Sequence, residues 1–197
     1  MRPGSGEWVD GGWLRTARRC VSPNHGARPP GAAVELALIH SISLPPGRYG
    51  SDAIERLFTN RLDADAHPYF AAIAGLRVSS HFLLRRDGEL VQFVDCDARA
   101  WHAGRSRWRG ADDCNDCSIG IELEGLEGLH FEDAQYARLA DLLRALAARY
   151  PIAGVAGHEH VAPGRKHDPG AGFDWPRIAK AMGWPARYFP EDLAPAG

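Results

Sequence analysis

Long apolar runs, a large net charge and a dense set of cysteines are all missing from this sequence of 197 residues. The longest apolar stretch, residues 32–39, contains Glu35, whereas a membrane-spanning helix needs about 20 apolar residues. Lysine and arginine together number 23, against 25 aspartates and glutamates. The net charge of −2 therefore argues against a protein built mainly to hold nucleic acid or an anionic membrane. Four cysteines are too few for a disulfide scaffold.

The first residues also lack the apolar core of an export signal, so we expect a cytoplasmic protein. We also expect that it has no obligate protein partner. Apolar residues make up 45% and charged residues 24%, which is typical of a globular domain. With 22 glycines and 14 prolines the chain is rich in loops without being of low complexity. The length fits one domain, predicted over residues 1–183 and followed by a loosely packed, proline-containing tail over 184–197.

Apolar runs bounded by turn residues predict several strands. The first run ends in His40, and the turn dipeptide Asp87-Gly88 between two later runs predicts a hairpin. The predicted strands cover residues 34–40, 81–85, 90–94, 118–124 and 152–156. Apolar residues at a spacing of 3.6, together with cap residues and prolines, predict the helices. These are a short helix near residues 13–19, two that begin at Asp52 and Pro68, a long one over 133–150 and a last one over 174–183. The mixture predicts an α/β or α+β domain with a single sheet.

Three polar residues lie at the ends of predicted strands or in the loops beyond them: His40, His158 and Asp168. Two histidines and a carboxylate suit a catalytic zinc ion, which keeps its fourth position open for water. The three residues do not form a compact motif, and a single histidine is more often a surface or hydrogen-bonded core residue. Spacing alone therefore leaves His160 and His167 as competing ligands.

Two carboxylates share the polar face of the predicted strand 118–124. Glu122 is the better candidate for a general base, but the alternation cannot separate it from Glu124, and a solvated sheet face would explain both. Lys166 precedes Asp168 by two residues, where it could stabilise an oxyanion or be an ordinary surface lysine. The pair Cys114 and Cys117 lacks the second cysteine pair that a structural zinc site requires.

A series of segments, in this order along the chain, resembles one known family. The segments are residues 12–14, 40–47, 57–59, 66–70, 76–79, 85–88, 100–104, 114–116, 118–125, 133–136, 157–166, 168–170 and 173–175. The family is the zinc-dependent N-acetylmuramoyl-L-alanine amidases of type 2, and within it the chain resembles the 1,6-anhydro-N-acetylmuramyl-L-alanine amidases. The resemblance covers residues 11–182 and is more specific than any single motif.

The resemblance implies a single domain with a mixed central β-sheet flanked by helices. It also implies a cytoplasmic enzyme of peptidoglycan recycling, which hydrolyses the amide between 1,6-anhydro-N-acetylmuramic acid and L-alanine in soluble muropeptides. Two alternatives stay open: a phage-type amidase that degrades polymeric cell wall, and a muropeptide sensor without turnover. The implied site residues are the zinc ligands His40, His158 and Asp168, the catalytic Glu122, the transition-state-stabilising Lys166, and the substrate-groove residues Tyr69, Arg77, Trp101 and His102.

Overall fold

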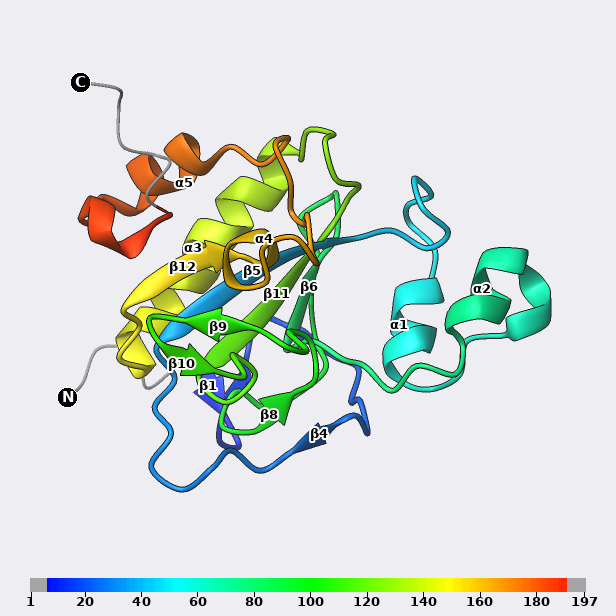
Figure 1. Cartoon of the computed structure of the whole chain (residues 1–197), viewed down its shortest axis with the longest axis horizontal. Coiled ribbons are helices and arrows are strands. Elements are labelled where there is room, and N and C mark those ends of the chain that lie inside the picture. The colour runs from blue at the N-terminus through cyan, green and yellow to red at the C-terminus, as the bar shows by residue number, and fades with distance from the viewer. Residues whose placement is uncertain (1–6, 191–197) are drawn as a thin grey trace.

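The computed structural model describes residues 7–190 and has a six-stranded sheet at its centre (Figure 1). The strand order is β12 (Gly154–Gly157), β5 (Leu36–Ile42), β11 (Ser118–Glu124), β6 (Phe82–Leu84), β7 (Leu90–Gln92) and β3 (Arg18–Arg19). The pairs β12–β5, β5–β11, β11–β6 and β7–β3 are parallel, whereas the predicted hairpin β6–β7 is antiparallel. The sheet is therefore mixed, which confirms the predicted fold class.

Helices flank the sheet. The helices are α1 (Ala53–Phe58), α2 (Pro68–Ile73), α3 (Asp133–Arg149), α4 (His158–Val161) and α5 (Trp175–Met182), with 3₁₀ turns η1 (Ala64–Ala66) and η2 (Ala186–Tyr188). Figure 1 shows α3 running along the sheet with α5 beside it, while α1 and α2 lie beyond the carboxyl end of β5. Three two-stranded ribbons complete the structure: β1 (Trp8–Val9) with β2 (Trp13–Leu14), β4 (His25–Gly26) with β8 (Arg99–Ala100), and β9 (Arg107–Trp108) with β10 (Ala111–Asp112). Within the described residues, no helix has the length and apolar content to cross a membrane.

The central strands are buried on both faces. All seven residues of β11 are buried, although the alternation of its sequence is also typical of a half-exposed strand. Its Ile119 and Ile121 pack in the same cluster as Leu143 of α3, whereas Leu36 and Leu38 of β5 belong to a separate cluster that includes Val161 of α4. Polar side chains on the second face of β11 are therefore held inside the protein, where they need partners or a function.

Local signals explain where the helices begin and end. Helix α3 ends before Pro151, which cannot continue a helix. Helix α5 begins at Asp174, whose carboxylate accepts a hydrogen bond from the Arg177 amide, and ends at Gly183, whose φ of 62° is a conformation that glycine adopts at low cost. The helices predicted over 133–150 and 174–183, and those starting near Asp52 and Pro68, are confirmed.

The structure corrects three local expectations. The helix near residues 13–19 is wrong: this segment forms β2 and β3, because the Leu14 amide donates to the Gln92 side chain and the segment pairs with β7. The second correction concerns the helix start predicted at Asp52. The Asp52 side chain makes no cap; instead the Ser51 hydroxyl accepts a hydrogen bond from the Ala53 amide at 3.3 Å.

The third correction concerns the predicted tail. Residues 184–190 are packed against the protein, since Phe189 is only 6% exposed and belongs to the main apolar cluster. The ring centroids of Trp184 and Tyr188 lie 5.3 Å apart. The expectation of loose packing is therefore wrong for 184–190, and residues 191–197 lie outside the described part of the chain.

Candidate active site

Sheet pairing brings two histidines and an aspartate together. In the parallel pair β12–β5, Gly157 is the partner of Ile39, so His158 follows at the same end of the sheet as His40. The Glu159 amide donates to the Asp168 carbonyl at 2.9 Å, which holds the loop that carries Asp168 over this end. One oxygen of Asp168, Oδ2, lies 2.9 Å from His40 Nδ1 and 3.2 Å from His158 Nδ1. All three side chains are buried, and one ligand atom from each lies within 4.8 Å of the others.

The chemistry of these three atoms fits a metal cation. His158 Nε2 lies 2.9 Å from the Ala103 carbonyl, which only accepts, so Nε2 carries the proton of the neutral ring and Nδ1 presents a lone pair to Asp168. Lone pairs that converge on a buried carboxylate require a cation between them. Zinc bound by imidazole nitrogen and carboxylate oxygen at about 2.0–2.2 Å needs ligand atoms at separations of this order.

The protonation states agree with this donor set. Burial lowers the pKa of His40 to about 4, although the nearby Asp168 carboxylate acts in the opposite direction. Burial alone would raise the pKa of Asp168, but its close contacts with the rings of His158 and His40 outweigh burial, and the pKa is lowered. Near pH 7 the site therefore offers one ionised carboxylate and the neutral His40, which suits a divalent ion.

The structure gives the two carboxylates of β11 different surroundings. Glu122 is the register partner of His40 across β5–β11, and its Oε2 is buried with no hydrogen-bond partner among the described residues. Burial, reinforced by the charge of Asp168, raises the pKa of Glu122 well above its usual value. Glu124 instead accepts from the Gly50 amide at 2.7 Å and from Arg85 at 3.2 Å. Glu122 thus remains available for chemistry, whereas Glu124 is engaged in holding the loop after β5.

A cleft of about 420 Å³ opens over these groups. Besides His40, His158 and Asp168, it is lined by Glu122, Lys166, Tyr69, Trp101 and His102, together with apolar residues from α1, α2 and the loops around them. Arg77 does not line it: its side chain is exposed and donates to the Gly75 carbonyl at 3.4 Å. Sequence reasoning missed Ser79 in the wall of the cleft, where its hydroxyl accepts from the Trp101 amide at 3.0 Å.

The competing histidines lie apart from the three ligand atoms. His160 accepts from the Gly157 amide through Nδ1 at 2.9 Å, and its ring packs edge-on against Trp175. His167 is exposed. Cys114 and Cys117 are free thiols, the first buried and the second partly buried.

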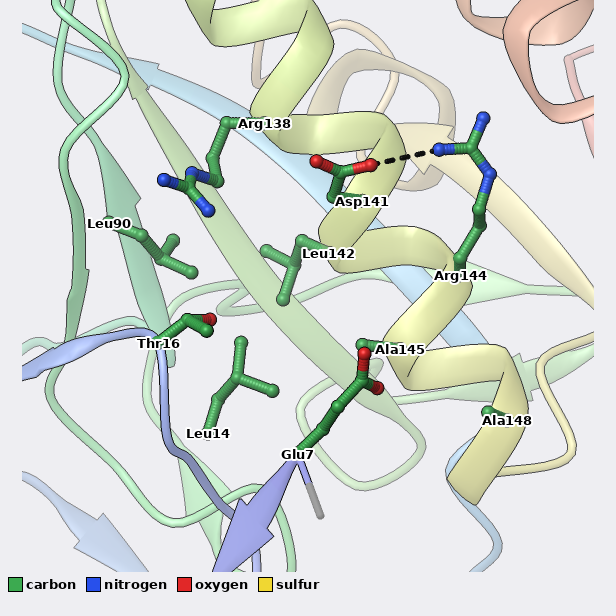
Figure 2. A pocket seen from close by; sticks show the side chains of 10 residues that line it. All are labelled: Glu7, Leu14, Thr16, Leu90, Arg138, Asp141, Leu142, Arg144, Ala145 and Ala148. Atoms are coloured by element: carbon green, nitrogen blue, oxygen red, sulfur yellow. Dashed lines mark hydrogen bonds and ion pairs between the residues drawn. The ribbon is translucent and has the colours of Figure 1, made fainter. Parts of the chain in front are cut away.

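A second cavity, of about 640 Å³, lies on the α3 side of the sheet (Figure 2). Its walls come from α3, the N-terminal ribbon and β7, and the ion pair Asp141–Arg144 spans its rim at 3.0 Å. None of the predicted site residues lines it. The smaller cleft is therefore the one in which reactive groups converge.

Known proteins are similar to this chain in sequence and fold. The N-acetylmuramoyl-L-alanine amidase family matches residues 30–171, which is more than half of the chain. The chain belongs to this family. It is 55% identical over 171 residues to the 1,6-anhydro-N-acetylmuramyl-L-alanine amidase AmpD of Salmonella typhimurium (strain SL1344), covering 86% of this chain and 91% of that protein.

Solved structures of amidases have the same fold. The crystal structure of a selenomethionine derivative of AmpD superposes with a TM-score of 0.85 at 53% identity, covering 89% of this chain and 99% of that one. The amidase AmiD from E. coli, solved with the substrate anhydro-N-acetylmuramic acid-L-Ala-D-gamma-Glu-L-Lys, superposes with a TM-score of 0.57 at 32% identity, covering 78% of this chain and 60% of that one. The predicted family, fold class and enzyme class, an amide hydrolase, are confirmed.

Proposed function

We propose that this amidase hydrolyses the amide bond between 1,6-anhydro-N-acetylmuramic acid and the L-alanine of soluble muropeptides, in peptidoglycan recycling. The observation that carries the proposal is the convergence of His40, His158 and Asp168 with Glu122 in one cleft, where Glu122 Oε2 is buried and has no hydrogen-bond partner among the described residues. The name of the 55% identical Salmonella relative supports the anhydro substrate, and the ligand named in the AmiD complex is of the same class.

A zinc ion held by His40, His158 and Asp168 would polarise the scissile carbonyl and lower the pKa of a water molecule at the open position. Glu122, whose Oε2 has no hydrogen-bond partner among the described residues, would in its ionised form accept a proton from the attacking water and later deliver it to the leaving amine. Lys166 lines the same cleft and supplies positive charge where the carbonyl oxygen becomes negative.

The substrate meets an aromatic and apolar wall. Tyr69 is 39% exposed on α2 and Trp101 is partly buried; both line the cleft and offer faces on which sugar or peptide can pack. Arg77 does not line the cleft, but it lies on the connection between α2 and β6, which contributes other residues to the cleft wall. From there its exposed side chain can pair with a substrate carboxylate. The role that we propose for His102 is given below.

The ligand assignment is tested by counting zinc. We expect the native protein to bind about one zinc, and His40→Ala or Asp168→Ala to lose most of it. The matched controls His160→Ala and His167→Ala should keep it, because these side chains lie apart from the three ligand atoms. Full zinc in Asp168→Ala, with loss in either control, would contradict the assignment.

The substrate is tested by mass spectrometry of the products, with and without a chelator. We expect kcat/KM for an anhydromuramyl tripeptide to exceed that for the hydrated tripeptide by at least about tenfold, or about 1.4 kcal/mol. Intact sacculi should be cut more slowly still. Equal rates on all three substrates would favour the wall-degrading alternative, and binding without turnover would favour the sensor.

The amidase domain boundary at residue 183 and the cytoplasmic location remain proposals alongside this function. Fractionation of cells that express the full chain tests the location. Most of the amidase activity should be found with the cytoplasmic markers.

A further inference from the structure

One turn of the chain contacts both histidines of the proposed zinc site from behind. The His102 ring lies 2.9 Å from His40 Nε2 through its Nδ1, and the next carbonyl, Ala103 O, lies 2.9 Å from His158 Nε2. These are the ring nitrogens that do not face Asp168. The same turn therefore touches the outer nitrogen of each proposed histidine ligand.

In the chain of hydrogen bonds that links His40, His102 and Ser118, only one assignment of donors and acceptors is consistent. The Ser118 hydroxyl donates to the Cys114 carbonyl at 2.5 Å, so its oxygen accepts from His102 Nε2 at 3.2 Å. His102 in its neutral form then carries its proton on Nε2 and accepts through Nδ1. His40 must therefore donate from Nε2, which leaves the lone pair of its Nδ1 facing Asp168.

The carbonyl of Ala103 sets His158 in the same way. A carbonyl only accepts, so His158 Nε2 donates and its Nδ1 lone pair also faces Asp168. Arg165 donates to the same carbonyl at 2.7 Å and to the Arg105 carbonyl at 2.6 Å, which holds the turn from its other side.

A buried asparagine holds this turn in place. Asn115 Oδ1 accepts from the His102 amide at 3.0 Å and from the Ala103 amide at 2.8 Å, and Asn115 is only 6% exposed. Gly120 of β11 makes room for the ring, because a Cβ there would lie 2.6 Å from His102 Cγ. The His102 ring has a defined place between the strand and His40.

We infer that the turn 102–103, held by Asn115, is the support that sets the tautomer and orientation of both histidine ligands, so that each offers Nδ1 to the metal. His102 is thus a positioning residue for the zinc site. The inference rests on the proposed zinc-dependent function. Outer partners of this kind contribute about 10–100-fold to metal affinity.

A pair of variants whose side chains have the same branched shape separates the hydrogen bond from packing. In His102→Asn, the amide oxygen occupies the place of Nδ1 and still accepts from His40, whereas His102→Leu offers no acceptor. We expect zinc competition against a chromophoric chelator to show about 10–100-fold weaker binding for His102→Leu, and most of the affinity retained by His102→Asn. Circular dichroism and thermal unfolding of the metal-free proteins establish that each variant folds.

Asn115→Ala should weaken zinc binding to a similar degree, because both amides of the turn lose their acceptor. Asn24→Ala is its matched control. Asn24 is 2% exposed and also holds loops together, donating to the Val78 carbonyl at 2.7 Å and to Asn60 at 2.9 Å. Its loss should lower the melting temperature without changing the zinc Kd.

A second readout is the ¹⁵N resonances of the imidazole rings in the zinc-loaded native protein. Protons on Nε2 of both His40 and His158, with metal on Nδ1, support the inference, and metal on Nε2 of either overturns it. A folded His102→Leu that binds zinc as the native protein does, or equal losses in His102→Leu and His102→Asn, would also overturn it. Failure of the native chain to bind zinc would instead sink the proposed function on which the inference depends.

Discussion

At the scale of single residues, two glutamates on one strand face show how surroundings decide chemistry. Glu122 and Glu124 are two positions apart on β11 and both are buried. Glu124 is satisfied by the Gly50 amide and Arg85, whereas Glu122 Oε2 has no partner among residues 7–190. An unsatisfied buried carboxylate costs stability, so its position beside the three proposed metal ligands points to catalysis.

Glu122→Gln should retain fold and zinc but lose about 10²–10⁴ in kcat, because an amide cannot accept the proton of the attacking water. The control Glu124→Gln should be much milder, since an amide oxygen can still accept from Gly50. Steady-state kinetics on an anhydro-muropeptide, with zinc content measured in parallel, makes the comparison. The reverse ranking would show that the wrong carboxylate is assigned as base.

The pH dependence of activity follows from the raised pKa of Glu122. Burial favours its protonated form, and only the ionised form accepts a proton. Activity should therefore fall as the pH drops through a value above the usual 4.5 of a glutamate. The low-pH limb of kcat/KM against pH measures this value, and a limb at or below pH 4.5 would contradict the expectation.

Glu55 should govern part of the acid stability. Hydrogen bonds from Arg18, and also from Arg85, lower its pKa from 4.5 to about 2. A carboxyl whose pKa is lower in the folded state stabilises fully above the unfolded value, and this contribution is lost as the pH falls from 4.5 toward 2. Glu55→Gln should cost about 1–2 kcal/mol at pH 7, less than the full shift implies because solvent screens these groups, and little near pH 2.

Denaturant unfolding at both pH values measures the effect of Glu55→Gln. Asp52→Asn is the matched control, because Asp52 forms an exposed i,i+4 pair with Arg56 on the same helix. Such a pair contributes only about 0.3–0.5 kcal/mol. An equal loss at pH 7 and pH 2 would show that Glu55 stabilises by packing and not by its charge.

At the scale of elements, strand β11 carries the candidate catalytic residue Glu122. Two positions earlier, the same strand has a glycine that leaves space for a neighbouring side chain. Parallel pairing places Glu122 beside His40, and the missing side chain at Gly120 leaves space for the His102 ring. On its other face the same strand packs Ile119, Ile121 and Leu123 into the cluster that includes α3. One strand thus joins the core to the site.

Gly120→Ala should disturb the site through this strand. The added Cβ would lie 2.6 Å from the His102 ring, which has no room to give without leaving His40. We expect a loss of about 1–3 kcal/mol in the free energy of unfolding, together with weaker zinc binding. Gly75→Ala is the control, since a Cβ there meets nothing within 4 Å. Unchanged zinc affinity in Gly120→Ala would contradict the close fit.

At the scale of the whole molecule, the last described residues belong to the core. Phe189 is 6% exposed and lies in the same cluster as Ile178 of α5 and residues of α3. Its aromatic neighbour Trp184 lies at a centroid distance of 6.4 Å. The segment 184–190 therefore stabilises the amidase fold instead of trailing from it.

Phe189→Ala should lower the free energy of unfolding by about 3 kcal/mol, the usual cost of removing a buried aromatic ring. Val21→Ala, at a position 62% exposed, should change it by less than about 0.5 kcal/mol. Thermal and denaturant unfolding of the metal-free chain make the measurement. If both substitutions changed the free energy of unfolding by the same small amount, the prediction of a loosely packed tail would stand.

The sequence by itself determined five of the six strands of the central sheet, the four main helices and the family, because periodicity, cap residues and ordered motifs are local properties of the chain. It did not determine that Arg18 and Arg19 pair with β7, or that Phe189 is packed in the core, because both depend on partners distant in sequence.

For the site, the sequence pattern could not decide whether Glu122 or Glu124 is the general base. It also could not decide which of His158, His160 and His167 is a zinc ligand. Only the resemblance to the family chose among them. The structure separates these residues in space because their surroundings come from β5, the loop at 50 and the turn 102–103, which no local pattern encodes. No local sequence pattern predicts that Asn115 supports the turn 102–103. Its role depends on the His102 and Ala103 amides, which only the fold brings to its side chain.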